Sequence, residues 1–184
     1  MTLSIIIPVY NEKKTLLEII KRVETADTLN LKKEIILVDD GSSDGTREIL
    51  KNLEEKYLVV YHSKNQGKGA ALRTGFRTAR GDIILIQDAD LEYNPQNYPR
   101  LLKPILENKT DVVYGSRALQ KNPHLNMGNY YGAKIISWLT SIFYGCRLTD
   151  VYTCYKVFKA GILKEIELES NGFDIEQEIT HTLG

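Results

Sequence analysis

Three short apolar runs in this chain each end abruptly in acidic or polar residues. Residues 5–9 lead into Tyr10-Asn11-Glu12, residues 35–38 into Asp39-Asp40-Gly41, and residues 83–86 into Gln87-Asp88-Ala89-Asp90. A continuous run of Val, Ile and Leu is typical of a strand buried on both faces of a parallel sheet. In open α/β sheets the ligand crevice lies just beyond the carboxyl ends of such strands. We therefore expect these carboxylates to converge on one edge of a sheet, where clustered like charges would bind a cation.

The spacing of apolar residues predicts an alternation of strands and helices. Residues 13–24 place an i, i+3, i+4, i+7 set on one helical face, namely Leu16, Ile19, Ile20 and Val23. Further strands are expected at 58–61 and 111–114, with a short segment at 154–158, and further helices at 47–53, 67–79, 95–106, 130–144 and 175–182. A polar loop is expected at 119–125. This order predicts right-handed crossovers and a mostly parallel, doubly wound α/β sheet in a single domain.

Composition excludes several classes of protein. The 24 basic and 24 acidic side chains balance, so no basic surface recommends nucleic acid as a partner. Cys146 and Cys154 are too few for a secreted disulfide framework, and we expect two buried free thiols. No signal peptide is visible, because the first apolar stretch is only about five residues long and Pro8 interrupts it. No membrane span is visible either, because the 130–144 helix is short and carries Lys134. We expect a soluble, cytoplasmic protein.

The sharpest local signal is Asp88-Ala89-Asp90. In an extended chain residues i and i+2 point to the same side, so both carboxylates can face one ligand. Hard cations such as Mg²⁺ or Mn²⁺ favour carboxylate and phosphate oxygens. Glu92, two residues further on, is a third candidate ligand. An exposed acidic strand end is the alternative, but the preceding buried run and the nearby Asp39-Asp40 pair favour a metal site.

A second group of polar residues follows the second apolar run. A carboxylate of the Asp39-Asp40 pair, at the end of a strand, can bind ribose hydroxyls or a base edge, as acidic residues do in other nucleotide-binding α/β folds. The alternative is a simple turn, since Asp, Gly and Ser all suit one. The neighbouring edge would be lined by Pro8, Val9, Tyr10 and Glu12, with Tyr10 offering a flat surface for a base.

The glycine-rich segment 65–69 precedes a predicted helix. Its glycines allow close backbone approach and a helix N-terminus attracts anions, although a plain loop-to-helix junction fits equally well. It is no P-loop, and Leu72 stands where a dinucleotide fingerprint needs its third small residue.

Several single polar residues are further candidates. Arg117 follows a predicted strand and is suited to bind phosphate or to form a surface ion pair. By default, we interpret Asp150 as a structural loop aspartate and Lys156 as a solvated lysine. The three histidines show no metal-ligand spacing, and we assign them no chemistry.

Taken together, these segments resemble the family 2 glycosyltransferases of the GT-A fold, and most closely their polyprenol-phosphate branch. The matching segments, in family order, are 7–12, 38–46, 65–69, 88–90, 115–117, 149–156 and 172–176. The resemblance implies a Rossmann-like three-layer α/β/α sandwich forming one catalytic domain over 1–184. Its nucleotide-binding part would span about 1–117 and its acceptor side about 118–184. Longer members continue past the final helix, so the resemblance also implies a C-terminally truncated chain or one lacking part of its acceptor site.

The resemblance further implies an inverting transferase that uses a UDP- or GDP-linked sugar and Mg²⁺ or Mn²⁺. The residues that it assigns to the nucleotide sugar are Pro8, Val9, Tyr10, Glu12, Val38, Asp40, Lys68, Asp88 and Ala89. Those that it assigns to the metal are Asp88, Asp90 and Glu92, with Glu92 at a position where several members have glutamine. Arg117, and with it Lys156, would bind the donor or acceptor phosphate. Asp150 would be catalytic or position the acceptor.

The acceptor decides the role of Asp150. A phosphate monoester has a second pKa near 6 and is largely ionised at pH 7, so a polyprenyl phosphate needs little help from a base. A sugar hydroxyl in a cell-surface polysaccharide would need one, and Asp150 is the best candidate. A non-catalytic nucleotide-sugar-binding module is a third alternative. The 130–144 helix could contact lipid at the inner face of a membrane or pack in the core, and we favour core packing. The sequence does not predict the oligomeric state.

Overall fold

One mixed sheet organises the molecule. In the computed structural model, which describes residues 1–116, 153–164 and 166–183, six strands form a sheet in the order β3-β2-β1-β4-β6-β5. The strands are β1 (Thr2–Val9), β2 (Lys32–Asp39), β3 (Leu58–Tyr61), β4 (Ile83–Ile86), β5 (Val112–Tyr114) and β6 (Lys156–Lys159). The first four run parallel, and β6 pairs antiparallel with both β4 and β5. The predicted α/β class with a mostly parallel sheet is confirmed.

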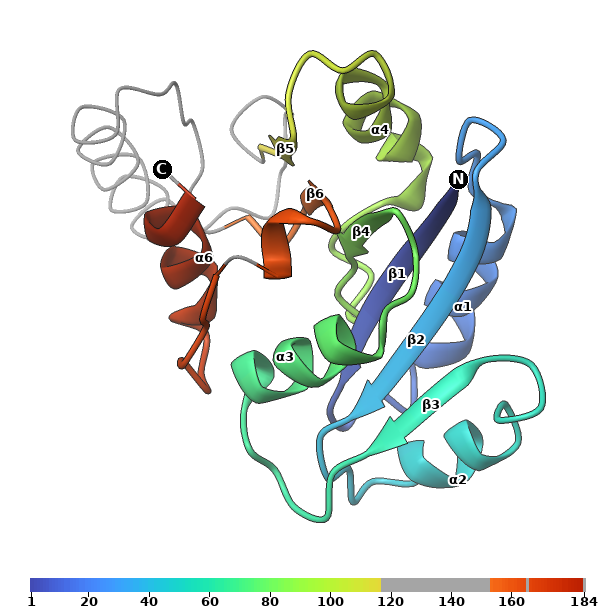
Figure 1. Ribbon diagram of the computed structural model, residues 1–184. Helices are drawn as coiled ribbons and strands as arrows, with labels where there is room; N and C mark the ends of the chain where they lie inside the picture. Colours follow the sequence, from blue (N-terminus) through green and yellow to red (C-terminus); the bar gives the residue numbers. More distant parts are fainter. Residues whose placement is uncertain (117–152, 165, 184) are drawn as a thin grey trace, which may run out of the picture.

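Helices cover both faces of this sheet (Figure 1). They are α1 (Leu16–Thr25), α2 (Thr46–Lys51), α3 (Lys68–Thr78), α4 (Tyr98–Leu106) and α6 (Ile175–Leu183), with short 3₁₀ turns at Pro95–Asn97 and Ile162–Lys164. Right-handed crossovers carry the chain from β1 through β2 to β3 and then back to β4, which puts α3 on the face opposite α1 and α2. The layers are therefore helix, sheet and helix, as predicted.

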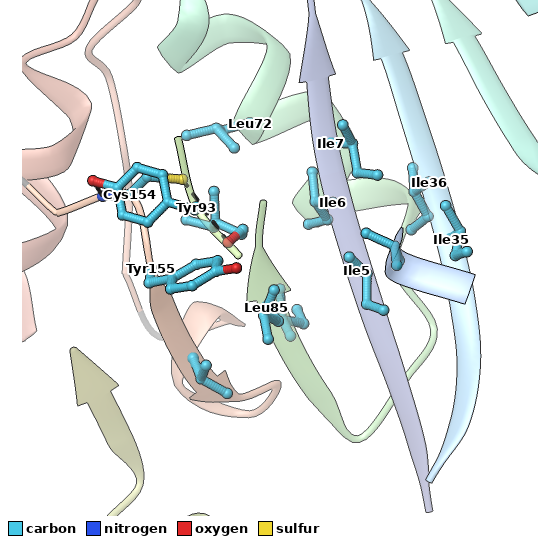
Figure 2. Packing of buried hydrophobic residues seen from close by; sticks show 14 of the residues in the cluster. Ile5, Ile6, Ile7, Ile35, Ile36, Leu72, Leu85, Tyr93, Cys154 and Tyr155 are labelled. Carbon is cyan, nitrogen blue, oxygen red and sulfur yellow. Dashed lines mark hydrogen bonds between the residues drawn. The ribbon is translucent and has the colours of Figure 1, made fainter. Parts of the chain in front are cut away.

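The three apolar runs form the centre of the core. The Val, Ile and Leu side chains of β1, β2 and β4 are almost completely buried, and Ile6, Ile36 and Leu85 are among those shown in Figure 2. On α1 the predicted face is buried in full, so the helical periodicity of that segment is confirmed. Burial of this kind contributes about 25 cal/mol for each Å² of apolar surface removed from water, so these runs fix the sheet and its edges.

Strand register brings the polar ends of the runs to one edge. Val9 pairs with Asp39, and Asp39 pairs with Tyr61, so β1, β2 and β3 end at the same level. Gln87 continues from β4 beside β1, because its backbone N–H donates to the backbone carbonyl of Ile6 at 3.0 Å. The chain therefore enters Asp88-Ala89-Asp90 next to the end of the central strand.

Most expected elements differ from the observed ones by one to three residues at an end, and the starts of α4 and β6 have shifted. The helix expected from Pro95 begins at Tyr98, because the Asn94 side chain accepts from the N–H of Gln96 (3.1 Å) and holds a separate 3₁₀ turn ahead of α4. The expected segment 154–158 becomes β6, shifted by two residues at its start. Cys154 is a buried free thiol, as expected.

Several features expected from the sequence lie outside the described residues. These are the loop at 119–125, the helix at 130–144, and Arg117, Cys146 and Asp150. Among the helices of the described ranges, none has the length and apolar character needed to cross a membrane.

Candidate functional site

A cavity of about 360 Å³ lies at the edge where β1, β2 and β4 end. The structure brings nine of the predicted site residues together in its wall: Pro8, Val9, Tyr10, Glu12, Asp40, Lys68, Asp88, Ala89 and Asp90. Four further residues complete the lining: Asn65, Gly67, Ala71 and Phe173. The acidic ends of separate strands thus meet around one hollow, which is the arrangement the apolar runs predicted.

Three other predicted residues lie away from this wall. Val38 is buried in the core within β2, and Glu92 is exposed on the turn after Asp90. Lys156 is 0% exposed, so the default interpretation of a solvated lysine is wrong. It lies behind the cavity because β6 pairs in the interior of the sheet, between β4 and β5.

The two carboxylates after β4 have different surroundings. Asp88 is partly buried, and its two oxygens lie 2.8 and 3.1 Å from the ammonium nitrogen of Lys68. Asp90 is exposed at the cavity, where its Oδ1 accepts from the N–H of Glu92 at 3.0 Å. The cavity wall partly shields Asp90 from water, which raises the pKa of its carboxyl, and the nearby charge of Asp88 raises it further. A cation placed between these carboxylates would relieve that repulsion.

The donor atoms of this wall fit a divalent metal ion in part. Asp88 and Asp90 supply hard carboxylate oxygens facing one space, as Mg²⁺ and Mn²⁺ prefer. Across the described ranges, no group of three or more His, Cys, Asp or Glu side chains is arranged to hold a metal by itself. An ion at this place would therefore need further oxygens from water or from a bound phosphate, which is typical of Mg²⁺ sites that bind a substrate diphosphate.

A buried polar cluster fixes the turn that carries Asp88. The side-chain oxygen of Gln87 accepts from the hydroxyls of Tyr98 and Tyr155, both at 2.9 Å, and its amide nitrogen donates to the carbonyl of Asp88 at 2.9 Å. Tyr155 packs against Tyr93 with ring centroids 4.8 Å apart (Figure 2). Because these polar groups are paired and buried, they hold the turn in one conformation. The sequence interpretation treated Gln87 only as the end of an apolar run.

Asp40 is held almost entirely by its own chain. It is 3% exposed, and its Oδ1 accepts from the His62 ring N–H (2.7 Å) and from the N–H of Gln66 (2.9 Å). Its Oδ2 accepts from the N–H of Gly67 at 2.8 Å. This carboxylate therefore shapes the loop that leads to Lys68. His62, to which the sequence interpretation assigned no chemistry, is part of that support.

Asp39 has a structural environment of its own. It is fully buried, with an oxygen 2.6 Å from the Arg47 guanidinium, and it accepts from the N–H of Ser42 at 3.1 Å. The hydrogen bond from Ser42 closes a turn, which was the alternative to ligand binding for this segment in the sequence analysis.

The glycine-rich segment 65–69 packs against the chain itself. The N–H groups of Gly69 and Ala70, in the first turn of α3, donate to the carbonyl of Asn171 at 2.7 and 3.3 Å. A Cβ on Gly69 would lie 2.2 Å from the carbonyl oxygen of Ser170. For these two amides the expected anion site is wrong, because a backbone carbonyl already occupies them. The close backbone approach that the glycines predicted is made by residues 170–171.

An ion-pair chain runs from the cavity into the interior. Lys68 lies between Asp88 and Glu176, with its ammonium nitrogen 2.9 Å from Glu176 Oε1. The other oxygen of Glu176 pairs with Lys156, whose ammonium also donates to the carbonyl of Thr153. Burial alone would lower the pKa of Lys68, but the groups around its ammonium, Asp88 and Glu176 among them, outweigh burial and raise that pKa. Lys68 therefore keeps its positive charge at the cavity.

Phe173 is a residue of the wall to which sequence reasoning gave no role. Its side chain is 77% exposed, and its ring centroid lies 5.8 Å from the Lys68 ammonium. Phe173 and Glu176 both fall in the matching segment 172–176, which was the available signal for them.

Comparison with known proteins agrees with this geometry. Residues 4–167 match the family model described as glycosyl transferase family 2. The chain belongs to this family. Among curated relatives, an undecaprenyl-phosphate 4-deoxy-4-formamido-L-arabinose transferase of Pseudomonas savastanoi pv. phaseolicola is 36% identical over 156 residues, covering 82% of this chain and 45% of the relative. A dolichol-phosphate mannosyltransferase of Pyrococcus furiosus is 33% identical over 188 residues, covering 97% and 52%. The chain thus spans about half the length of these relatives.

Solved structures agree on the fold. Glucosyl-3-phosphoglycerate synthase from Mycobacterium tuberculosis, in complex with Mn²⁺, UDP and phosphoglyceric acid, superposes with a TM-score of 0.74 at 22% identity, covering 95% of this chain and 61% of that one. TarS residues 1–349 of S. aureus give a TM-score of 0.67 at 23% identity, covering 99% and 55%. The fold expected from the resemblance, the GT-A fold, is confirmed.

Proposed function

We propose that this chain is the catalytic part of an inverting, metal-dependent glycosyltransferase that moves a sugar from a UDP- or GDP-linked donor to a polyprenyl or dolichyl phosphate. The observation that carries the proposal is the single cavity in which Asp88, Asp90 and Lys68 meet Tyr10 at the ends of parallel strands. Membership of the family supports transfer of a sugar. Two relatives named for polyprenyl-phosphate acceptors support the choice of acceptor.

The charged side of the cavity suits a diphosphate. Asp88 and Asp90 would hold a Mg²⁺ or Mn²⁺ ion, which when bound supplies positive charge for the departing nucleoside diphosphate. The Lys68 ammonium is ionised and lines the same wall, so it adds a second positive charge from the protein. Fixed charges in a partly buried site stabilise developing negative charge better than mobile water does.

The apolar side of the cavity suits a nucleoside. Pro8 and Val9 end β1 at the wall, and Tyr10 is 47% exposed there with a flat ring face. An aromatic ring of this kind can stack on a base, while Glu12 and Asn65 offer polar groups at the same wall. None of these groups specifies uracil or guanine, so the donor stays UDP- or GDP-linked in this proposal.

For the acceptor side we keep the roles implied by the resemblance. Arg117 would balance the charge of the phosphates, and Asp150 would orient the acceptor rather than remove a proton. The implied phosphate role of Lys156 is not kept, because its ammonium is fully buried and pairs with Glu176. An ionised phosphate monoester is already a nucleophile at pH 7. Because a polyprenyl chain is apolar, the enzyme would work in contact with a membrane surface, at its inner, cytoplasmic face.

The test is a thermal-stability screen followed by transfer. We expect UDP- or GDP-sugars to raise the melting temperature only when Mn²⁺ or Mg²⁺ is present, because the ion would hold the diphosphate. The effect is large enough to measure, since a ligand at 100 times its Kd adds about 2.7 kcal/mol to the free energy of unfolding. The stabilising donor, radiolabelled in the sugar, is then incubated with a polyprenyl phosphate and, in a second arm, with a sugar-hydroxyl acceptor. If the donor binds but its sugar is transferred only to the hydroxyl, the acceptor in the proposal changes from a polyprenyl phosphate to a sugar hydroxyl. If the donor binds and no sugar is transferred to either acceptor, a non-catalytic binding module is favoured. Stabilisation by no nucleotide sugar would refute the donor site.

A further inference from the structure

The ion-pair chain behind the cavity includes a carboxylate that the proposed reaction does not use. Glu176 is 4% exposed and lies on α6, while the residues that it pairs with lie on α3 and β6. Burying a carboxylate costs several kcal/mol unless it is well paired, so a buried ion pair beside a binding cavity calls for an explanation.

Lys68 is shared between two carboxylates. Its ammonium nitrogen lies 2.8 Å from an oxygen of Asp88 and 2.9 Å from Oε1 of Glu176. The Glu176 contact is an ion pair without hydrogen-bond alignment, whereas the second oxygen of Asp88 accepts a hydrogen bond from the same ammonium at 3.1 Å. The positive charge of Lys68 attracts both carboxylates, so neither carboxylate alone neutralises it.

The position of Glu176 is fixed from two directions. Its other oxygen pairs with Lys156, which is fully buried in β6. The segment just ahead of α6 is anchored to α3, because Asn171 accepts from the N–H of Gly69 and its side-chain oxygen accepts from Arg73 at 2.6 Å. Glu176 therefore meets Lys68 as part of a rigid support and not as a loose surface contact.

The charges in this row are balanced. Asp88, Lys68, Glu176 and Lys156 alternate in sign, and their formal charges cancel, so Asp90 adds an excess negative charge at the cavity. Without Glu176, both lysines would act on the Asp88 side of the cavity and would oppose a cation there.

We propose that Glu176 is a positioning residue for the cation site. It draws part of the charge of Lys68 away from Asp88, and so leaves the Asp88 oxygens able to bind a divalent cation. The inference rests on the proposed function, because it assumes that Asp88 and Asp90 hold such an ion. Groups of this kind, one shell behind a metal ligand, typically change metal affinity by about 10- to 100-fold.

The experiment measures Mn²⁺ affinity from the electron paramagnetic resonance signal of the free ion. Replacing Glu176 alone would leave the Lys156 ammonium buried without this carboxylate and would endanger folding. The test therefore compares the double variant Glu176→Gln/Lys156→Met with Lys156→Met alone. We expect the double variant to bind Mn²⁺ about 10- to 100-fold more weakly than the single variant, at a melting temperature within a few degrees of it.

A second variant keeps the proposal testable if the double variant folds poorly. Glu176→Asp retains the charge next to Lys156 but is one methylene shorter, and we expect it to weaken Mn²⁺ binding at least threefold with the fold intact. Glu107→Gln is the matched control, because Glu107 is also ion-paired but lies at the surface end of α4. Its Mn²⁺ affinity should equal that of the parent.

The outcomes separate the inference from the proposed function. If Asp90→Asn abolishes Mn²⁺ binding and both Glu176 variants bind as their references do, the positioning role is wrong while the cation site stands. The positioning role is equally wrong if the variants lose thermal stability but keep Mn²⁺ affinity, since Glu176 would then be structural only. If the parent binds no Mn²⁺, or binds it equally well with Asp90→Asn, the proposed metal site fails and this inference fails with it.

Discussion

Two regions meet at the cavity, and they are built in different ways. The first is the edge formed by β1, β2 and β4, where short buried strands place Tyr10, Asp40 and Asp88 within a few residues of the core. The second is the segment 169–176, which reaches the cavity from the far end of the described chain and contacts α3 through its backbone (Figure 1). The edge carries its chemistry on local motifs, whereas the segment acts through contacts between residues about 100 positions apart.

The two regions therefore have different roles. At the edge, Tyr10 and Asp90 are exposed at the cavity and would touch a ligand, whereas groups of segment 169–176 hold α3 and Lys68 in place. Replacements of these exposed edge residues should therefore affect binding and catalysis with little loss of stability. Replacements in the segment or in its docking surface should affect stability first.

Asp90→Asn should have the largest effect of the replacements considered. Asp90 is exposed at the cavity and pairs with no lysine in the described residues, so its loss removes a cation ligand without breaking an ion pair. We expect sugar transfer to fall at least ~100-fold, because a metal contributes several kcal/mol to charge stabilisation. Initial rates with the stabilising donor measure this, beside the melting temperature, which should stay near that of the parent.

Asp111→Asn serves as the control for that measurement. Asp111 is also an exposed acidic residue, and its partner is Lys159 at 2.6 Å. Its replacement should leave both rate and stability nearly unchanged, as expected of an exposed pair. A rate for Asp90→Asn within threefold of the parent would mean that the edge does not carry the chemistry.

Gly69→Ala tests the other region. In an exposed helix this change would add up to about 1 kcal/mol of stability, because alanine favours helix more than glycine does. Here the new Cβ would lie 2.2 Å from the carbonyl oxygen of Ser170, which is backbone and has little room to move. We expect a net loss of about 1–3 kcal/mol in the free energy of unfolding, measured by urea denaturation.

Gly161→Ala gives the matched comparison, since no atom lies within 4 Å of a Cβ at that position. It should change the free energy of unfolding by less than about 0.5 kcal/mol. Equal stability of Gly69→Ala and the parent would show that segment 169–171 is not docked on α3 as the structure has it.

The sequence was informative where structure depends on neighbouring residues. The buried face of α1 follows from a 3.6-residue period, and the strand runs follow from unbroken Val, Ile and Leu. The meeting of Asp40 and Asp88 at one edge follows from the rule that parallel strands present their carboxyl ends together. These inferences need no knowledge of which distant residues pack against them.

The remainder depended on partners that sequence spacing cannot identify. That Gln87 would accept from two tyrosine hydroxyls, or that Lys156 would be buried against Glu176, is decided by tertiary packing. The glycines of 65–69 predicted close backbone approach, but the pattern is the same whether a phosphate or another piece of chain approaches. Segment 169–171 is what approaches, and only the folded structure distinguishes the two.

Glu92→Ala, which removes the carboxylate without supplying a glutamine oxygen in its place, should have the smallest effect, and it sharpens the limits of the edge. The resemblance implied Glu92 as a third metal ligand, yet its side chain is exposed and stands outside the cavity wall, and the hydrogen bond to Asp90 comes from its backbone N–H. An exposed charge in water and salt interacts with a nearby ion by a few tenths of a kcal/mol. We therefore expect Mn²⁺ affinity to change by no more than about threefold. A tenfold loss would place Glu92 among the ligands, and would mean that the turn after Asp90 folds over the cavity when the ion binds.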